Sequence, residues 1–323
     1  MSGGPARQPV RSLQELIERQ ASAAVGVGRA GKSCWNGRIE RLPRPGDPPN
    51  VLGMADWDGT LRYSDARVLR PLGRMFTRGG RKPAARTLAA YKEALLTVFH
   101  ENNHLLAPRD QEHRDGRARW DWSTMLLEEG VTETYSRRRL HEFIDLMGLE
   151  DVAPGIGTAP TPTAYPQYVP AVEALTTWVA VRAGIPADDV LQQLNAETAA
   201  GKYQRFVSLA IGDAAHRMDP ARLAACRRDL EATLRRVLGQ ARLFPLVKSQ
   251  TFGELSGWLG SEAVQVLDEQ LATIEGGAGS PHPPPPQLAG TGLKAHGAGQ
   301  VLRSPAGSRR AAIRLRPSLG HSR

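Results

Sequence analysis

The apolar residues between positions 84 and 106 recur at steps of three and four along the chain: Leu88, Tyr91, Leu95, Val98 and Phe99. This spacing places their side chains on one face of an α-helix. Pro83 stands where the first turn of a helix tolerates a missing N–H, and Pro108 follows shortly after the segment. The pattern therefore predicts a mostly buried helix over residues 84–106.

A second helix is predicted after Asp121, which has the side chain of an N-cap residue, and it continues towards Met147. Residues 109–119, between the two helices, are polar and charged. They predict a surface loop. Closer to the N-terminus, Ser12 and Glu15 predict the capped start of a short helix over residues 12–25.

The strongest β signal lies just upstream of the first long helix. Residues 51–55 are followed by a turn signal at positions 56–59 and by a short apolar run at 60–63. These segments predict a small sheet against that helix. Two interpretations of strand 60–63 stay open: an edge strand that lines a substrate site, and part of a purely structural hairpin.

The second half of the chain reads as helical up to residue 275, after a Pro- and Thr-rich loop at 152–170 that is either a hinge or a lid. Five helical segments are predicted: 171–183, 187–199, 203–216, 220–243 and 252–274. The predicted fold is α+β and mostly α. We divide it into a flexible N-terminal segment (1–50), a core (51–150), a helical C-terminal lobe (151–275) and a disordered, basic Pro/Gly-rich tail (276–323).

The first long helix contains a match to the pattern His-Glu-x-x-His, formed by His100, Glu101 and His104. Residues four apart lie one above the other on a helix, so two imidazoles can bind one zinc ion. Glu101 would lie beside that ion and take a proton from bound water. The alternative is a pair of core histidines and a salt-bridged glutamate on an ordinary helix.

The second helix contains Leu127-Glu128-Glu129-Gly130-Val131-Thr132. With the first motif, this sequence resembles the gluzincin metallopeptidases, the thermolysin-like and aminopeptidase-like branch of the zincins. The resemblance covers residues 83–146. It implies a zincin-like fold, Zn²⁺ as cofactor and hydrolysis of protein or peptide substrates.

The resemblance also implies roles for individual residues. Glu129 would be the third zinc ligand beside His100 and His104, and Glu101 would be the general base. Glu133, one turn after Glu129, would hydrogen-bond one of the histidines and orient it. The alternative for the acidic residues of the second helix is a solvated face paired with arginines at positions 137–139.

A peptidase of this kind also needs a group that stabilises the oxyanion. Four residues stay open for this role: Tyr165, Tyr168, Tyr203 and His141. His113 is interpreted as a loop residue. The sequence Gly26-Val-Gly-Arg-Ala-Gly31-Lys32-Ser33 matches a P-loop, but a polar helical segment precedes it and a Pro-rich stretch follows, so we predict a flexible loop.

Charge and composition bear on the possible binding partners and on the location of the protein. The formal net charge is +9, and the tail beyond residue 275 carries seven basic residues and no acidic one. The basicity therefore belongs to the tail rather than to a folded nucleic-acid-binding face. A weak tether to an anionic partner and a solvated tail both fit it. The absence of a long apolar run or an N-terminal secretion signal, with only Cys34 and Cys226 present, predicts a cytoplasmic protein.

The function predicted from the sequence is a zinc-dependent peptidase. Two other classes stay open. One is a zincin-fold protein that binds metal or a partner without hydrolysing anything. The other is a helical protein that binds nucleic acid or another partner and carries the motif by accident.

Overall fold

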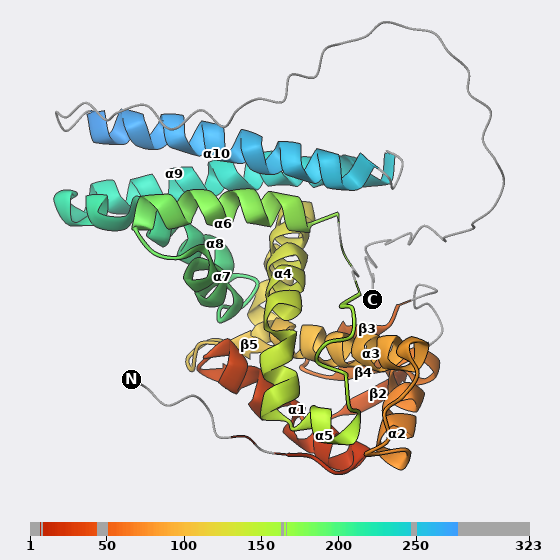
Figure 1. Cartoon of the computed structure of the whole chain (residues 1–323). Helices are drawn as coiled ribbons and strands as arrows, with labels where there is room; N and C mark the ends of the chain where they lie inside the picture. The colour runs from red at the N-terminus through yellow and green to blue at the C-terminus, as the bar shows by residue number, and fades with distance from the viewer. Residues whose placement is uncertain are drawn as a thin grey trace, which may run out of the picture.

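Two helices in contact at the centre of the molecule organise the fold (Figure 1). They are α3 (Ala85–His104) and α4 (Trp122–Leu146), and both were predicted from the sequence. The computed structural model describes Arg7 and residues 9–43, 51–162, 165, 167–246 and 251–276. This part of the chain is mostly helical with small sheets, which confirms the mostly α, α+β class.

The remaining elements surround this pair. The other helices of four residues or more are α1 (Leu13–Gly28), α2 (Arg70–Thr77), α5 (Leu149–Val152), α6 (Val169–Ala183), α7 (Ala187–Asn195), α8 (Gly201–Ile211), α9 (Pro220–Leu238) and α10 (Phe252–Gly276). The strands are β1 (Lys32–Ser33), β2 (Ile39–Leu42), β3 (Gly53–Ala55), β4 (Leu61–Ser64) and β5 (Leu106–Ala107). Short π- or 3₁₀-helical turns are η1 (Asp65–Leu69), η2 (His113–Arg119), η3 (Gly212–Arg217) and η4 (Gly239–Leu246).

The last three turns of α3 are buried on every side. Asn102 donates to Gln20 Oε1 at 3.0 Å and to the hydroxyl of Tyr63 at 3.2 Å. Asn103 donates to Ser136 Oγ at 2.9 Å. Because buried polar groups need partners, these bonds account for two asparagines between the motif histidines and connect α3 to α1, β4 and α4.

Helix α3 ends two residues earlier than predicted. Its last residue is His104, and Leu106–Ala107 forms β5, which pairs with β1 in an antiparallel register of Ser33 to Leu106. Pairing with a strand from the N-terminal segment therefore competes with the last half-turn of the helix. The second motif helix begins as predicted, because the Asp121 carboxylate accepts from Thr124 N at 2.7 Å.

The three-stranded sheet has the order β2-β4-β3, with β2 parallel and β3 antiparallel to β4. Strand β4 is thus the central strand, and the interpretation of residues 60–63 as an edge strand is wrong. It failed because β2, which the sequence did not reveal, covers the other side of β4. The edge next to α3 is β3 instead.

Within the N-terminal segment expected to be flexible over residues 1–50, the described residues 9–43 include a helix and strands that belong to the folded unit. Helix α1 packs on α3, and Leu16, Ala24 and Val27 are buried. The Ser12 hydroxyl caps α1 by accepting from Glu15 N at 3.1 Å, as predicted. Burial of these apolar side chains stabilises the helix. The segment is too short for hydrophobic periodicity to have indicated this burial strongly.

The Gly-rich segment 26–33 runs from a helix into a strand. Residues 26–28 form the last turn of α1, and Lys32–Ser33 forms β1. A P-loop has the opposite order, from a strand into the N-terminus of a helix that binds the phosphate. This arrangement excludes a P-loop at this segment.

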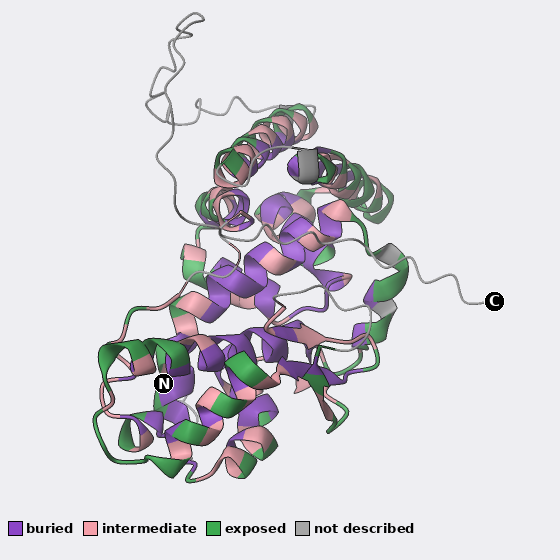
Figure 2. Cartoon of the chain, turned by 90° about the vertical axis from the view of Figure 1, so that its right-hand side faces the viewer, coloured by how far each residue is buried: buried purple, intermediate pink, exposed green. Residues whose placement is uncertain are grey.

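The C-terminal helices form the upper half of the molecule (Figure 1). Helices α6, α9 and α10 lie alongside one another, while α7 and α8 contact α6, and α4 runs from this layer down to the sheet half. The predicted helical segments after residue 170 are therefore confirmed. One continuous apolar core extends from Leu16 in α1 to Leu271 in α10, and Figure 2 shows the exposed residues on the outer helices.

The predicted disordered tail falls outside the described residues, apart from the end of α10 at Gly276. Among the helices that the structure describes, none has both the length and the apolar character that a membrane crossing requires.

Candidate metal centre

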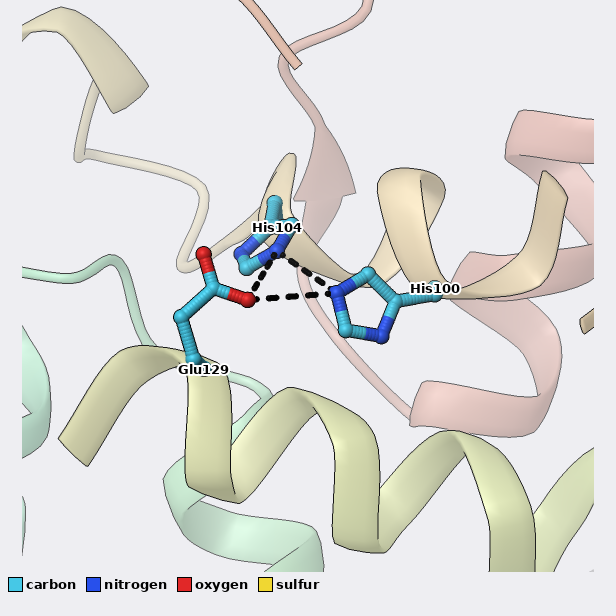
Figure 3. Close-up of side chains that lie close together, drawn as sticks. All are labelled: His100, His104 and Glu129. Carbon is cyan, nitrogen blue, oxygen red and sulfur yellow. Dashed lines mark hydrogen bonds and ion pairs between the residues drawn. The ribbon is translucent and has the colours of Figure 1, made fainter. Parts of the chain in front are cut away.

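Three side chains from the two central helices meet at one point (Figure 3). His100 and His104 lie one turn apart at the C-terminal end of α3, and Glu129 projects from α4 towards both. The two Nε2 atoms are 3.1 Å apart. Glu129 Oε2 lies 3.4 Å from His100 Nε2 and 3.7 Å from His104 Nε2.

These separations fit a tetrahedral metal site. Zinc binds imidazole nitrogen and carboxylate oxygen at about 2.0–2.2 Å, so two ligand atoms of a tetrahedral site lie about 3.4 Å apart. The three observed distances, 3.1, 3.4 and 3.7 Å, are distributed around that value. Hydrogen bonds among the three side chains explain this geometry less well than a shared metal ion. Between two Nε2 atoms 3.1 Å apart, only one can donate an N–H to the other.

Each imidazole is oriented by a carboxylate on its far side. His104 Nδ1 lies 2.8 Å from Glu128 Oε1, and His100 Nδ1 lies 3.3 Å from Glu133 Oε2. His104 Nδ1 is hydrogen-bonded to Glu128, whereas His100 Nδ1 and Glu133 form an ion pair; a proton held on each Nδ1 would leave the lone pair of each Nε2 to face the candidate metal position. The structure thus places Glu133 beside His100, one of the two histidines considered for it.

Glu128 is the residue of the candidate site whose contact with His104 the sequence did not reveal. Its second oxygen is 2.8 Å from Lys202 Nζ of α8, and both side chains are almost fully buried. Lys202 Nζ also donates to the backbone carbonyl of Glu197 at 2.9 Å. The chain Lys202–Glu128–His104 therefore connects the C-terminal helices to the site. No local pattern indicates it, because Lys202 lies far from both motifs in the sequence.

The alternative of a solvated acidic face on α4 is wrong for Glu128 and Glu133, which are 1% and 0% exposed. Arg139 pairs with Glu142 at 2.8 Å. Arg138 pairs with Glu173 at 3.2 Å and with Asp188 at 2.7 Å, on the outside of the helix. The two buried glutamates form ion pairs with histidines and a lysine: Glu128 with His104 and Lys202, and Glu133 with His100.

Carboxylates dominate the electrostatics of the site. Burial alone would lower the pKa of His104, but the carboxylates of Glu129 and Glu128 outweigh it and raise the pKa to about 9. The pKa of His100 is also raised well above 6.5, since Glu129 and Glu133 outweigh burial. Burial works against ionised Glu129, yet both imidazoles lower its pKa well below the usual range. In the absence of metal, the site thus holds positive charge as protons on the histidines.

Glu101 lies beside this centre on the side of the sheet. Its carboxylate is buried and accepts from the backbone N–H of Ala55 in β3. Burial, the largest effect, raises the pKa of Glu101. Gly53 makes room for this side chain, because a Cβ on Gly53 would lie 2.6 Å from Glu101 Cγ. The edge strand therefore positions the glutamate predicted as general base.

A cavity of about 540 Å³ opens beside the candidate metal centre. Its polar lining includes Glu101, His104, Glu129 and the hydroxyl-bearing Tyr165. Its aromatic lining includes tryptophans from the β3–β4 turn and from the start of α4. All three residues of β3, Gly53, Met54 and Ala55, also line the cavity.

The four residues considered for oxyanion stabilisation differ in their position relative to the cavity. Tyr165 lines the cavity and stacks on His100, with 5.2 Å between ring centroids. Tyr168 is buried behind it, stacked at 6.2 Å. Tyr203 is buried with the Arg235 guanidinium 3.8 Å from its ring centre, and His141 is mostly exposed. Neither of the last two residues lines the cavity.

His113 also requires a correction. The residue was interpreted as part of a surface loop, but it is 6% exposed and lines the cavity. Its ring stacks on Trp57, and burial lowers the pKa of His113 to about 4, so the imidazole is neutral at pH 7. The polar composition of residues 109–119 concealed this, because tertiary contacts with a distant turn decide its burial.

Lys92 of α3 fixes the loop that carries Tyr165. The residue is 5% exposed, and its ammonium donates to the backbone carbonyls of Gly157 and Ala159. The start of the Pro/Thr-rich loop is thereby held against the motif helix.

No protein-family model, no curated protein and no solved structure matches this chain. Its function has to be argued from the chemistry of the site.

Proposed function

We propose that the protein is a zincin-like zinc peptidase in which His100, His104 and Glu129 hold the metal. The observation that carries this proposal is the triangle of ligand atoms at 3.1, 3.4 and 3.7 Å, with a buried glutamate from the same helix beside it. Three protein ligands leave a fourth tetrahedral position for water or substrate.

The donor set fits zinc. Two imidazoles and one carboxylate are a ligand set of catalytic zinc sites, and each imidazole has a carboxylate on its other nitrogen. When bound, zinc acts as a Lewis acid that polarises the substrate carbonyl and makes water acidic enough to react near neutral pH.

The side chains of the protein would handle the proton. Glu101 would take a proton from the water as its oxygen attacks the peptide carbonyl carbon. When the C–N bond breaks, Glu101 would give that proton to the departing amine nitrogen. The raised pKa of Glu101 supports both transfers, since it brings the carboxyl group closer to neutral pH.

Two further features support peptide hydrolysis. Tyr165 lines the same cavity, and burial raises its pKa well above 10, so its hydroxyl stays protonated and can donate to a developing oxyanion. Strand β3 is an edge strand along the cavity, and an extended peptide can pair with such an edge through its backbone.

The experiment starts from metal content. We expect about one zinc per chain in the wild type, and loss or strong weakening of binding in His100→Ala and Glu129→Ala. Glu101→Gln should retain zinc and lose hydrolysis of a mixed peptide library. Glu93→Gln is the matched control, because this glutamate lies on the same helix and pairs with Arg67 near the surface.

Each contrary result has a definite meaning. Full hydrolysis by zinc-loaded Glu101→Gln would refute the proposed mechanism. Zinc retained in Glu129→Ala would move the third ligand to Glu128 or Glu133. Zinc in the wild type without hydrolysis of any peptide would favour a non-catalytic metal-binding protein, and no zinc after reconstitution would leave the motif accidental.

A further inference from the structure

Three rings that line the cavity are in contact with one another. Trp57 stacks on His113, with centroids 4.8 Å apart and an interplanar angle of 22°. Trp120 meets Trp57 edge-on at 5.1 Å and 76°. All three line the cavity, and we call them the aromatic wall.

The aromatic wall is built by segments outside the two motif helices. Trp57 comes from the β3–β4 turn, whereas His113 and Trp120 lie at the two ends of the η2 segment between α3 and α4. Gly116 holds this segment against the turn, because a Cβ on Gly116 would lie 3.1 Å from a ring carbon of Trp57. The wall is therefore formed before any ligand arrives.

The ionised groups beside the aromatic wall already have partners. Asp56 pairs with Arg62 at 2.8 Å. Asp121 accepts from Thr124 N at 2.7 Å and from Ser123 Oγ at 2.6 Å, as the N-cap of α4. Between them, Met54 and Met125 add apolar surface to the cavity. An occupant that is large, apolar and uncharged matches this lining best.

Exposure of Trp120 supports the same conclusion. Its relative exposure is 37%, which places it among the few large hydrophobic residues described as exposed. It lines the same cavity as Glu101, His104 and Glu129. A substrate residue bound against the wall therefore lies in the same cavity as the proposed metal.

We propose that the aromatic wall is a specificity subsite that takes a bulky apolar or aromatic side chain of the peptide substrate. That the bound peptide is a substrate rests on the proposed peptidase function. The preference of the aromatic wall for a bulky apolar side chain requires neither hydrolysis nor metal. Residues from the β3–β4 turn and the η2 segment, rather than from the zinc-binding motifs, would then select the peptide.

The test measures peptide binding directly. Blocked tripeptides Ala-X-Ala, with X as Phe, Leu, Ala, Arg or Glu, are titrated by calorimetry against zinc-loaded Glu101→Gln and against metal-free wild type. We expect the Phe peptide to bind about tenfold or more tightly than the Ala peptide in both proteins, because a buried aromatic ring contributes most through its apolar area. The Glu and Arg peptides should bind no better than the Ala peptide.

Three variants locate the preference. Trp57→Ala and Trp120→Ala should bring the Phe/Ala ratio of dissociation constants close to one. Trp258→Ala is the matched control, since Trp258 is 50% exposed on α10 and does not line the cavity, and it should leave the ratio unchanged. The ratio is compared only among variants whose circular dichroism and melting temperature match the wild type. Trp120→Ala keeps the test valid if Trp57→Ala fails to fold, because Trp120 is more exposed than Trp57 and its removal should disturb folding less.

Equal binding of the Phe and Ala peptides to the wild type would overturn the proposal. So would tightest binding of the Arg peptide, or a preference for Phe that survives both Trp57→Ala and Trp120→Ala. A wild type that prefers Phe in binding yet hydrolyses no peptide would leave the subsite in place and refute the peptidase function instead.

Discussion

Two groups of residues line the cavity, which we call the metal end and the aromatic wall, and they are held in place in different ways. The metal end consists of charged side chains held by a chain of hydrogen bonds and ion pairs, from Lys202 through Glu128 to His104. The aromatic wall consists of rings held by stacking and close packing, with Trp57 against His113 and Gly116. At the metal end, removal of one partner leaves a buried charge, whereas at the wall it leaves a space. We therefore expect mutations at the metal end to have larger effects.

The largest effect is expected for Lys202→Met. The change leaves Glu128 as a buried carboxylate without its lysine, and breaking a buried ion pair costs about 3–5 kcal/mol of unfolding free energy. It also loosens the support of His104, so zinc affinity should fall about 10- to 100-fold. Chemical denaturation and zinc titration with a competing chelator measure the two effects.

Arg205→Met on the same helix is the matched control. Arg205 pairs with Glu197 at 2.9 Å but is 44% exposed, so its loss should cost little stability and leave zinc affinity unchanged. Equal effects of the two substitutions would show that the Lys202–Glu128 pair does not support the site.

The charge of the metal end also predicts a pH dependence for the metal-free protein. The pKa of His104 is raised from 6.5 to about 9, so protonated His104 contributes stability that is complete below pH 6.5 and lost as pH rises through 9. The unfolding free energy should fall by on the order of 3 kcal/mol across this window. Denaturation in the presence of a chelator at several pH values measures it.

Zinc binding should show the opposite trend. Binding requires unprotonated imidazoles, so the apparent zinc affinity should rise with pH up to about 9. A metal-free protein that gains stability from pH 6.5 to 9 would contradict the carboxylate-dominated site.

A smaller and more selective effect is expected for Gly53→Ala. The added methyl group would lie 2.6 Å from Glu101 Cγ and 2.7 Å from its Oε1, so Glu101 has to shift. Because a displaced general base impairs the chemical step, hydrolysis should slow roughly tenfold or more while zinc content stays at the wild-type level. Steady-state kinetics beside metal analysis separates the two.

Gly73→Ala in α2 serves as the control for that variant, since the nearest atom to a Cβ at this position is 3.9 Å away. It should keep full activity and gain slight stability from the better helix propensity of Ala. Loss of zinc in Gly53→Ala would mean that β3 supports the metal ligands and not Glu101 alone.

The smallest effect is expected for a mutation in the aromatic wall on zinc binding. Trp120→Ala should bind zinc as the wild type does, because Trp120 belongs to the aromatic wall, where its ring contacts Trp57, and is not one of the three proposed ligands. Metal analysis of this variant tests whether the two ends act independently. A clear loss of zinc would show that the wall and the metal end form one cooperative unit.

Local sequence patterns determined much of the metal end. The steps of three and four along residues 84–106 predicted α3, Asp121 predicted the start of α4, and helical geometry then placed His100 and His104 on one face. Helix periodicity and capping are local properties, so they can be inferred from the chain alone. That Glu129 meets both histidines followed from the resemblance, and the structure brings the three together.

Tertiary packing decided the rest. Lys202 reaches Glu128 from a helix more than 70 positions later, β2 turns β4 into a central strand, and His113 is buried by a tryptophan from a distant turn. Each of these features depends on a contact between distant segments, and the local sequence of one segment does not indicate the other. The sequence by itself thus determined which helices carry the proposed metal ligands. Only the tertiary structure decided which buried charges support that chemistry and which rings surround its cavity, because burial is a property of the assembled core.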